Sequence, residues 1–284
     1  MRAFRTSALA LLVLALVGAP GAHAIDVCGN GICLGTAVPP ETCSTCPADC
    51  GVCPPPPAVL VVNMMPFAQS GETTQDSQPH LAVNPLNPQQ IAGATANTAS
   101  NDPLFSPLFV STNGGTTWIL NNILHGGGPA GNTTLSFGAG NNLYAAGQLF
   151  NSGYTIVART SNIASPSAMS ILFGRPNVLQ PWVQARPNAG GDRLYFGFDD
   201  LAAWGTGKTA SIARTPNATV QTPLWETFKL GTRPACFEDL PPVRLAIHAD
   251  GTVYGVYYRR QLDGRCNESL PIPSDVVVVR DDNG

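Results

Sequence analysis

From about Ala58 onward, the 284-residue sequence repeats one pattern of short strand-like runs four times. Each unit contains a strand, a tight turn rich in Gly, Asn or Pro, a second strand, a loop and a third strand. The first strands begin at Leu81, Leu135, Val183 and Leu245, so the units are 54, 48 and 62 residues apart. Repeats of about this length are typical of propeller blades that carry loop insertions. The sequence therefore predicts an all-β chain, a β-propeller of about four recognisable blades.

The composition supports this prediction and excludes other classes. The chain has 29 Gly and 26 Pro, and 12% of its residues are charged, against roughly 25% in average soluble domains. A net charge of −3 provides no basic surface for a phosphate backbone. We therefore expect neither long charged helices nor a nucleic-acid partner.

The N-terminus reads as a secretory signal. Residues 1–24 combine an early basic stretch, an apolar run of about ten residues and an Ala22-x-Ala24 end, which predicts cleavage after Ala24. The apolar run is too short for a membrane span, which needs roughly 20 residues. We expect an extracellular or periplasmic protein with no membrane anchor after cleavage.

Export makes disulfides the expected state of the eight cysteines. Six of them lie within residues 25–53, which predicts a small disulfide-rich module of open connectivity, and residues 54–58 form a proline linker to the propeller at 59–284. Cys236 and Cys266 flank the first two strands of the fourth unit and are expected to pair. The six clustered cysteines are Cys28, Cys33, Cys43, Cys46, Cys50 and Cys53.

The cysteine cluster, with Cys-Gly-Asn-Gly-Ile-Cys33 and Cys46-Pro-Ala-Asp-Cys50, resembles the Notch-type cysteine-rich repeat. That resemblance implies three disulfides around one structural calcium ion, with Asn30, Glu41 and Asp49 as oxygen ligands. The alternative is a metal-free module, in which Gly29-Asn30-Gly31 is a tight turn that needs positive φ and Asp49 caps a turn.

One loop of the first unit, Ser111-Thr-Asn-Gly-Gly-Thr-Thr-Trp118, resembles the Asp-box of sialidases and sialidase-like (BNR-repeat) propellers. Its motif positions are Ser111, Asn113, Gly115 and Trp118, with Asn113 where Asp is usual. Ser-Gln-Pro-His80 and Leu-Gln-Pro-Trp182, each just before a first strand, add to the likeness. The resemblance implies a hairpin between the third and fourth strands of a blade, with its Trp packed between blades.

The resemblance to sialidases does not extend clearly to their chemistry. Sialidases hold a substrate carboxylate in an Arg triad and use a Tyr nucleophile with a Glu, and an Asp as acid/base. No Arg lies between Arg5 and Arg159, so one arm of the triad is absent. The remaining candidates for a catalytic group are Arg244, Tyr257, Arg259 and Glu226.

Structural roles compete with this catalytic interpretation. Tyr257 and Tyr258 are adjacent on a strand and are expected to be one core ring and one surface ring. Arg259 is expected to be a solvated strand end. The histidines lie far apart and His80 is expected to be structural.

Three functions follow. The first is a secreted, non-catalytic sialidase-like propeller that binds an extracellular glycan or protein. The alternative is an exo-sialidase-type glycoside hydrolase whose site is completed by blades beyond residue 284. A third is an adhesion fragment that depends on partner chains. The fourth unit stops at Gly284 within a turn, which predicts an incomplete propeller; the alternative is a closed four-bladed ring that residues 60–64 complete.

Overall fold

The computed structural model divides the chain into two units, Met1–Leu60 and Val61–Gly284. The predicted signal segment 1–24, the linker 54–58 and the predicted Cys236–Cys266 disulfide lie outside the described residues. The structure describes residues 28–33, 35, 40–53, 61–64, 76–97, 107–123, 130–149, 153–164, 169–202, 209–231, 243–260 and 274–282.

Three disulfides hold the described part of the first unit together, as predicted. Each joins a cysteine of the first half of the cluster to the third cysteine after it, with Cα atoms 4.8 to 5.5 Å apart. The helix α1 (Pro47–Cys50) begins with a proline, which suits the first helical position because that residue has no intrahelical N–H bond to lose. The pairs are Cys28–Cys46, Cys33–Cys50 and Cys43–Cys53.

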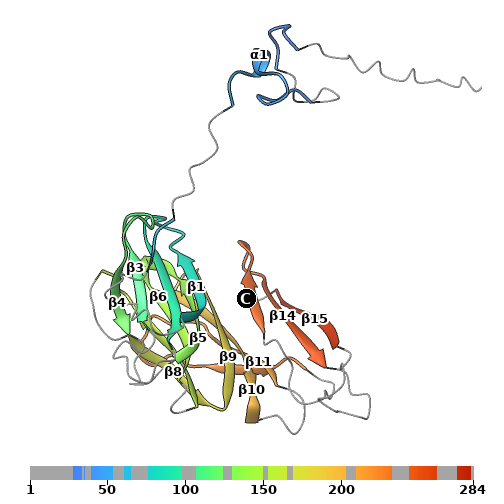
Figure 1. Cartoon of the computed structure of the whole chain (residues 1–284). Helices are drawn as coiled ribbons and strands as arrows, with labels where there is room; N and C mark the ends of the chain where they lie inside the picture. The colour runs from blue at the N-terminus through green and yellow to red at the C-terminus, as the bar shows by residue number, and fades with distance from the viewer. Residues whose placement is uncertain are drawn as a thin grey trace, which may run out of the picture. The chain divides into compact units, whose positions relative to one another are not determined.

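The described strands of the second unit form four antiparallel sheets, and in each sheet the strands follow chain order. We name them blades 1 to 4; the first three have four strands and the fourth has three. In Figure 1 the colour runs in chain order from blade 1 (teal and green) to blade 4 (orange and red). This arrangement confirms the all-β, propeller prediction. The strands are β1 (Asp76–Val83), β2 (Ile91–Asn97), β3 (Pro107–Ser111), β4 (Ile119–Ile123), β5 (Ala130–Phe137), β6 (Leu143–Leu149), β7 (Tyr154–Thr160), β8 (Ser170–Pro176), β9 (Val178–Asn188), β10 (Gly191–Asp200), β11 (Ala210–Thr215), β12 (Glu226–Lys229), β13 (Arg244–Ile247), β14 (Val253–Arg260) and β15 (Ser274–Asp281), with a 3₁₀ turn η1 (Ala139–Asn141) between β5 and β6.

The blades pack face to face through apolar side chains of alternate residues. On β6, Leu143 and Ala145 belong to the buried cluster shared with blade 1, while Tyr144 and Ala146 belong to the cluster shared with blade 3. Successive side chains of a strand point to opposite faces, so a strand inside the stack is buried on both. A third cluster joins blades 3 and 4.

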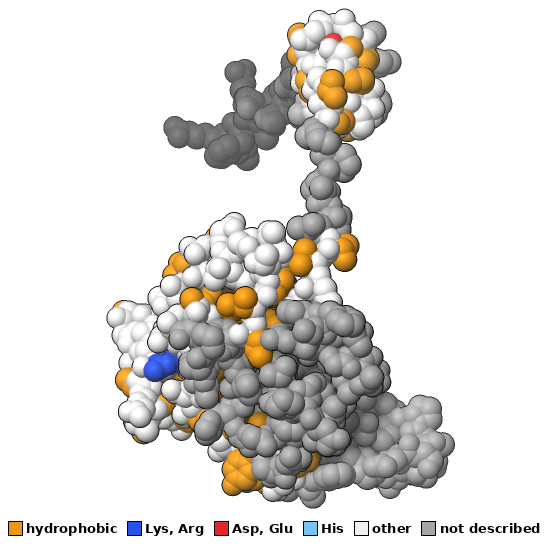
Figure 2. Space-filling view, turned by 60° about the vertical axis from the view of Figure 1, so that its left-hand side comes forward, with side chains coloured by type: hydrophobic (Ala, Val, Ile, Leu, Met, Phe, Trp, Pro, Cys, Tyr) orange, Lys and Arg blue, Asp and Glu red, His pale blue; other side chains and the backbone are white. Residues whose placement is uncertain are grey.

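One described face of the protein carries few charges. On the face shown in Figure 2, the described side chains are mostly uncharged, with little blue or red.

The first strand of each blade lies against the first strand of the next: β1 against β5, β5 against β9, and β9 against β13. Each first strand is the inner edge of its sheet, and an edge leaves backbone groups without sheet partners. A side chain of the preceding blade satisfies one of them at the same position in each repeat. His80 Nδ1 accepts from Leu135 N (3.2 Å), Thr134 Oγ1 accepts from Val183 N (3.0 Å), and Trp182 Nε1 donates to Leu245 O (3.0 Å).

A buried carboxylate ties blade 2 to blade 3. Asp192 is fully buried and accepts from the Tyr144 hydroxyl (2.7 Å), from Asn142 Nδ2 (2.8 Å) and from the amide of Ala139 (2.6 Å). Buried carboxylates are stable only when such donors surround them. Asp192 therefore fixes η1 of one blade on the turn that opens β10 of the next.

Residues 61–64, part of the segment considered as a closing strand, belong to none of these sheets. Met64 instead lies over Gly93 of β2, where an added Cβ atom would clash with the Met64 sulfur. The described part of this segment thus covers blade 1 and is not paired with β15.

Candidate functional site

The first strands of all four blades begin around one cavity of about 190 Å³, which we call the axial cavity. It is lined by residues 78–80 of β1, 132–134 of β5 and 180–182 of β9, together with Arg244 of β13. These are corresponding positions in the sequence repeats. Corresponding residues of the four repeats therefore lie next to one another around this cavity.

Three lining residues have a backbone conformation that side chains rarely adopt. Gln78, Asn132 and Gln180 have φ values of 54°, 52° and 47°. In each case the pairing with the second strand is interrupted at this point by a register shift. A non-glycine residue in this region costs of order 1–3 kcal/mol and persists where the surroundings enforce it, often at a functional site. Because the same strained conformation occurs at the corresponding residue of three consecutive blades, it indicates that this cavity is a candidate functional site.

Two residues after each of these positions, blades 1 and 3 contribute His80 and Trp182, and blade 4 contributes Arg244 at the corresponding position. His80 and Trp182 meet edge to face, with ring centroids 5.3 Å apart and an interplanar angle of 81°. The guanidinium of Arg244 lies 4.8 Å from the Trp182 ring centroid, within the range of a cation–π contact. Thr134 takes the corresponding position in blade 2. One side of the axial cavity is therefore an aromatic and cationic wall.

The wall has a defined protonation state. Because His80 Nδ1 accepts the Leu135 amide, the proton of the neutral imidazole lies on Nε2. Burial, and then the charge of Arg244, lowers the pKa of His80, so the ring is neutral at pH 7. Burial also lowers the pKa of Arg244, against the opposing effect of Asp199. Arg244 remains a cation, because a guanidinium does not lose its proton in proteins.

Two lining groups hold buried polar atoms without a hydrogen-bond partner in the described protein, Thr133 Oγ1 and Arg244 Nη1. A buried polar atom without a partner is costly, so a ligand that supplied one would be stabilised. Amides of Gln and Asn, a hydroxyl, an imidazole N–H and a guanidinium offer both donors and acceptors. The described lining has no Asp or Glu.

The four residues considered for catalysis do not come together here. Arg244 lines the axial cavity, but Glu226 lies on β12 and bonds Arg214 (3.2 Å). Tyr257 is buried in the cluster between blades 3 and 4, whereas its neighbour Tyr258 is 43% exposed, as expected for one core ring and one surface ring. Arg259 is 6% exposed and pairs with Asp275; the expectation of a solvated strand end is wrong, because this carboxylate on β15 holds the guanidinium against the sheet.

The residues predicted to bind calcium have protein partners. Asp49 accepts hydrogen bonds from the amides of Gly29 (2.6 Å), Asn30 (3.2 Å) and Gly31 (2.9 Å), and both glycines have positive φ. Burial acts to raise the pKa of Asp49, but these three bonds outweigh it and hold the pKa below its ordinary value. Glu41 is 7% exposed. The turn cap that stood as the alternative is thus present, and calcium binding stays a prediction.

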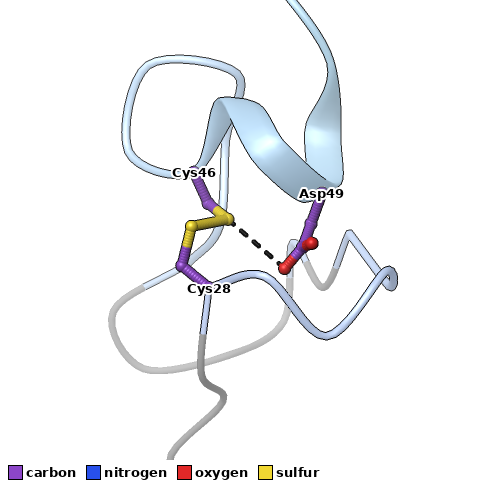
Figure 3. Close-up of side chains that lie close together, drawn as sticks. All are labelled: Cys28, Cys46 and Asp49. Atoms are coloured by element: carbon purple, nitrogen blue, oxygen red, sulfur yellow. Dashed lines mark hydrogen bonds between the residues drawn. A yellow bond between two sulfur atoms is a disulfide. The ribbon is translucent and has the colours of Figure 1, made fainter.

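One carboxylate oxygen of Asp49 also lies 3.3 Å from Cys46 Sγ, as Figure 3 shows. Cys28, Cys46 and Asp49 bring their potential ligand atoms within 4.8 Å of one another. Both sulfurs belong to the Cys28–Cys46 disulfide, so they carry neither a proton to donate nor the thiolate charge that a zinc site needs. The cluster is a packed disulfide and not a zinc site.

The loop 111–118 joins β3 to β4 and is held by its own side chains. Asn113 Oδ1 accepts from the Thr117 amide (2.9 Å), and Ser111 Oγ accepts from the Gly115 amide (2.8 Å). Trp118 Nε1 donates to Gly115 O (3.0 Å). A Cβ atom added at Gly93 of β2 would lie 3.5 Å from the Trp118 ring, so the ring lies over the second strand of its own blade.

The axial residues Gln78, Asn132 and Gln180 were not predicted as a site. The available signal is the Gln-Pro pair before His80 in the first unit, which recurs before Trp182 in the third unit. That pattern indicated a family likeness, but neither the positive φ nor the convergence of blades 1 and 3 can be read from it. His80, expected to be only structural, lines the cavity.

No family model matches the chain, and no curated protein matches it. The fold does match solved structures. An α-L-arabinofuranosidase of Fusarium graminearum, in complex with an iminosugar inhibitor, matches with a TM-score of 0.51 at 12% identity, over 78% of this chain and 66% of that one. An α-L-arabinanase of Penicillium chrysogenum, complexed with arabinobiose, matches with a TM-score of 0.51 at 18% identity, over 76% of this chain and 65% of that one. The chain thus spans about two thirds of the length of each.

These matches correct the predicted family. The assignment to sialidase-like propellers preceded by a Notch-type repeat is wrong, since the fold matches propellers that are named as an α-L-arabinofuranosidase and an α-L-arabinanase. The physical reason for the wrong assignment is that the residues resembling an Asp-box form a hairpin that is stabilised by its own hydrogen bonds. Such a turn is a local solution, and it does not identify the site of the whole propeller.

Proposed function

We propose that this chain is a secreted, glycoside-hydrolase-like β-propeller that binds a pentose-containing oligosaccharide in its axial cavity. The observation that carries the proposal is the convergence of Gln78, Asn132 and Gln180, all with positive φ, on one cavity with Trp182 and Arg244. Strain of this kind is characteristic of functional sites.

The chemistry of the lining suits a sugar. Sugars present hydroxyls that both donate and accept, and the lining offers amides, Thr133 Oγ1 and Arg244 Nη1. They also present apolar ring faces, for which the half-buried Trp182 is a partner. A volume of about 190 Å³ is smaller than the roughly 300–1,000 Å³ of sites for drug-sized ligands, so the cavity suits one sugar ring of a longer chain.

Hydrolysis is the second candidate. The two matched structures are enzymes named for arabinose-containing substrates, and this likeness favours hydrolysis over a purely structural role. Glycoside hydrolysis ordinarily needs two carboxylates. The described lining has none, but Asp199 lies on β10 opposite Leu179, next to Gln180, and acts electrostatically on Arg244. Asp199 is therefore the first carboxylate to test.

Export is part of the proposal. Three disulfides indicate folding in an oxidising compartment. Among the described residues no helix is long and apolar enough to span a membrane.

Retention on insoluble arabinan and release of reducing sugar from soluble arabinan test the two functions. Retention without release, abolished by Trp182→Ala and kept by the control Trp225→Ala, supports binding alone. Release that Asp199→Asn abolishes supports hydrolysis. A protein that neither binds nor cleaves arabinan, and binds no other pentose polymer, contradicts both.

A further inference from the structure

A second cavity, of about 350 Å³, lies between blades 3 and 4 and is separate from the axial cavity. We call it the interblade cavity. Blade 3 lines it with Tyr195, Ile212 and Phe228, and blade 4 with Val253 and Val279. Its volume is within the range of small-molecule sites.

The interblade cavity lies at the interface with the smallest of the three buried apolar clusters. The interfaces between blades 1 and 2 and between blades 2 and 3 each hold a large buried apolar cluster, and the cluster between blades 3 and 4 is smaller. Gly255 lies on the cavity wall, where an added Cβ would lie 3.0 Å from Val279. A larger residue at this position would press on the side chains of Val279, Val243 and Leu245.

The cavity holds a polar group that the repeat leaves without its partner. Tyr195 is 2% exposed, and its hydroxyl has no hydrogen-bond partner in the described protein. Tyr144 is the corresponding residue of blade 2, and its hydroxyl donates to Asp192 of the next blade. The position that corresponds to Asp192 in blade 4 is Gly251, which has no side chain to offer. The guanidinium of Arg186 fills the space beside Gly251, so a ligand group would reach the Tyr195 hydroxyl only from the cavity.

Charges at the rim of the cavity are already paired. Arg214 bonds Glu226 (3.2 Å) and Asp281 (3.1 Å), and its guanidinium lies 5.0 Å from the Phe228 ring centroid. Arg280 pairs with Asp282. A charged ligand would have to displace these pairs or lose its own hydration inside an apolar wall, so the cavity selects against charge.

We propose that the interblade cavity is a binding site for an uncharged, largely apolar small molecule of the phenol class, whose oxygen pairs with the Tyr195 hydroxyl. The aromatic body lies between Ile212 and Phe228 on one side and Val253 and Val279 on the other. The site is independent of glycan binding in the axial cavity.

Fluorescence titration of the purified protein with 2-naphthol tests the proposal, with naphthalene and 2-naphthoate as matched probes. The expected result is saturable binding of 2-naphthol, about 5–10-fold tighter than naphthalene because one hydrogen bond to a buried hydroxyl is worth about 1 kcal/mol. The anion 2-naphthoate should bind more weakly than either.

Two variants locate the binding. Tyr195→Phe keeps the ring and should remove the preference for 2-naphthol over naphthalene, while Ile212→Phe should fill the cavity and abolish both. The control Tyr258→Phe changes an exposed tyrosine of blade 4 and should have no effect. Absence of saturable binding by the wild type, an unchanged preference in a folded Tyr195→Phe, or displacement of 2-naphthol by arabinobiose would each overturn the proposal.

Discussion

The rings of His80 and Trp182 meet edge to face, with centroids 5.3 Å apart, although they belong to blades 1 and 3. Each ring also bonds the backbone of the following blade, at Leu135 and at Leu245 respectively. The wall of the axial cavity is therefore part of the frame that holds the first strands together. A ligand at this wall would contact groups whose rotamers are already fixed, which limits the entropy lost on binding.

The strain at Gln180 can be measured. With φ at 47°, glycine adopts this backbone conformation without steric strain. Alanine retains the strain, because its Cβ atom crowds the backbone at positive φ. We expect Gln180→Gly to be about 1 kcal/mol more stable in urea unfolding than Gln180→Ala, with glycan binding weakened equally in both. Gln184 serves as the control, since it lies within the regular pairing of β9; there alanine should be the more stable. The opposite order at Gln180 would show that its conformation is not strained.

Asp192 should be a main determinant of the contact between blades 2 and 3. Asp192→Asn replaces an acceptor of three hydrogen bonds by a group that carries its own N–H donors. We expect a loss of about 3 kcal/mol in the free energy of unfolding, because hydrogen bonds to a charged group contribute more than neutral ones. The exposed Asp282→Asn should stay within about 0.5 kcal/mol of the wild type. A loss below about 1 kcal/mol at Asp192 contradicts this role.

The same contact predicts a pH dependence. Burial, and then the hydrogen bond and charge of Asp192, raises the pKa of Tyr144 in the folded protein. The stabilisation is complete below the tyrosine pKa of the unfolded chain, about 10, and falls as the pH rises above it, since only the unfolded chain then loses the proton. Urea unfolding above pH 10 should therefore show a shallower loss of stability in Tyr144→Phe than in the wild type, by at most about 1.4 kcal/mol per pH unit. Equal slopes would mean that Tyr144 ionises as easily in the folded state.

In the disulfide module, Asp49 should control the turn at residues 29–31. A carboxylate with a lowered pKa stabilises the turn above the unfolded pKa of about 4 and ceases to do so as the pH falls through the lower folded value. Amide exchange followed by NMR should quicken at Gly29 and Gly31 in Asp49→Asn. In the wild type at low pH, the protection of these two amides relative to their intrinsic exchange rate should fall. Exchange rates unchanged by the substitution would count against the cap.

The calcium prediction has a distinct outcome in the same measurement. If Asn30, Glu41 and Asp49 supply oxygen ligands, calcium should slow exchange at the turn and EDTA should reverse the effect. If neither calcium nor EDTA changes the exchange rates, Asp49 acts only as a turn cap and the calcium prediction is wrong.

The features that could be predicted from the sequence, the strands and the turns between them, depend on short-range patterns of residues. Strand runs at Leu81, Leu135, Val183 and Leu245 each fall in or adjoin the first strand of a blade, because alternation and turn residues act within a few positions. The catalytic hypothesis joined residues that are near in sequence, such as Tyr257 and Arg259. On β14, however, Tyr257 is buried in the cluster between blades 3 and 4, and Arg259 is paired with Asp275.

The axial cavity could not be found in that way. It depends on contacts between residues from different blades, and His80 and Trp182 come together only when the blades are stacked. Positive φ at Gln78 and Gln180 is equally invisible, since each precedes a proline, a context that favours extended backbone.

Calorimetric titration with arabinobiose tests the central claim most directly. We predict saturable binding to the wild type, weakened roughly 10- to 100-fold in Arg244→Met, because a charge-assisted hydrogen bond contributes about 1.5–3 kcal/mol. Arg280→Met, which removes an exposed arginine outside the axial cavity, should bind as the wild type does. Arabinobiose binding that is equally strong in a folded Arg244→Met variant, or absent in the wild type, would contradict the assignment of this cavity to the glycan.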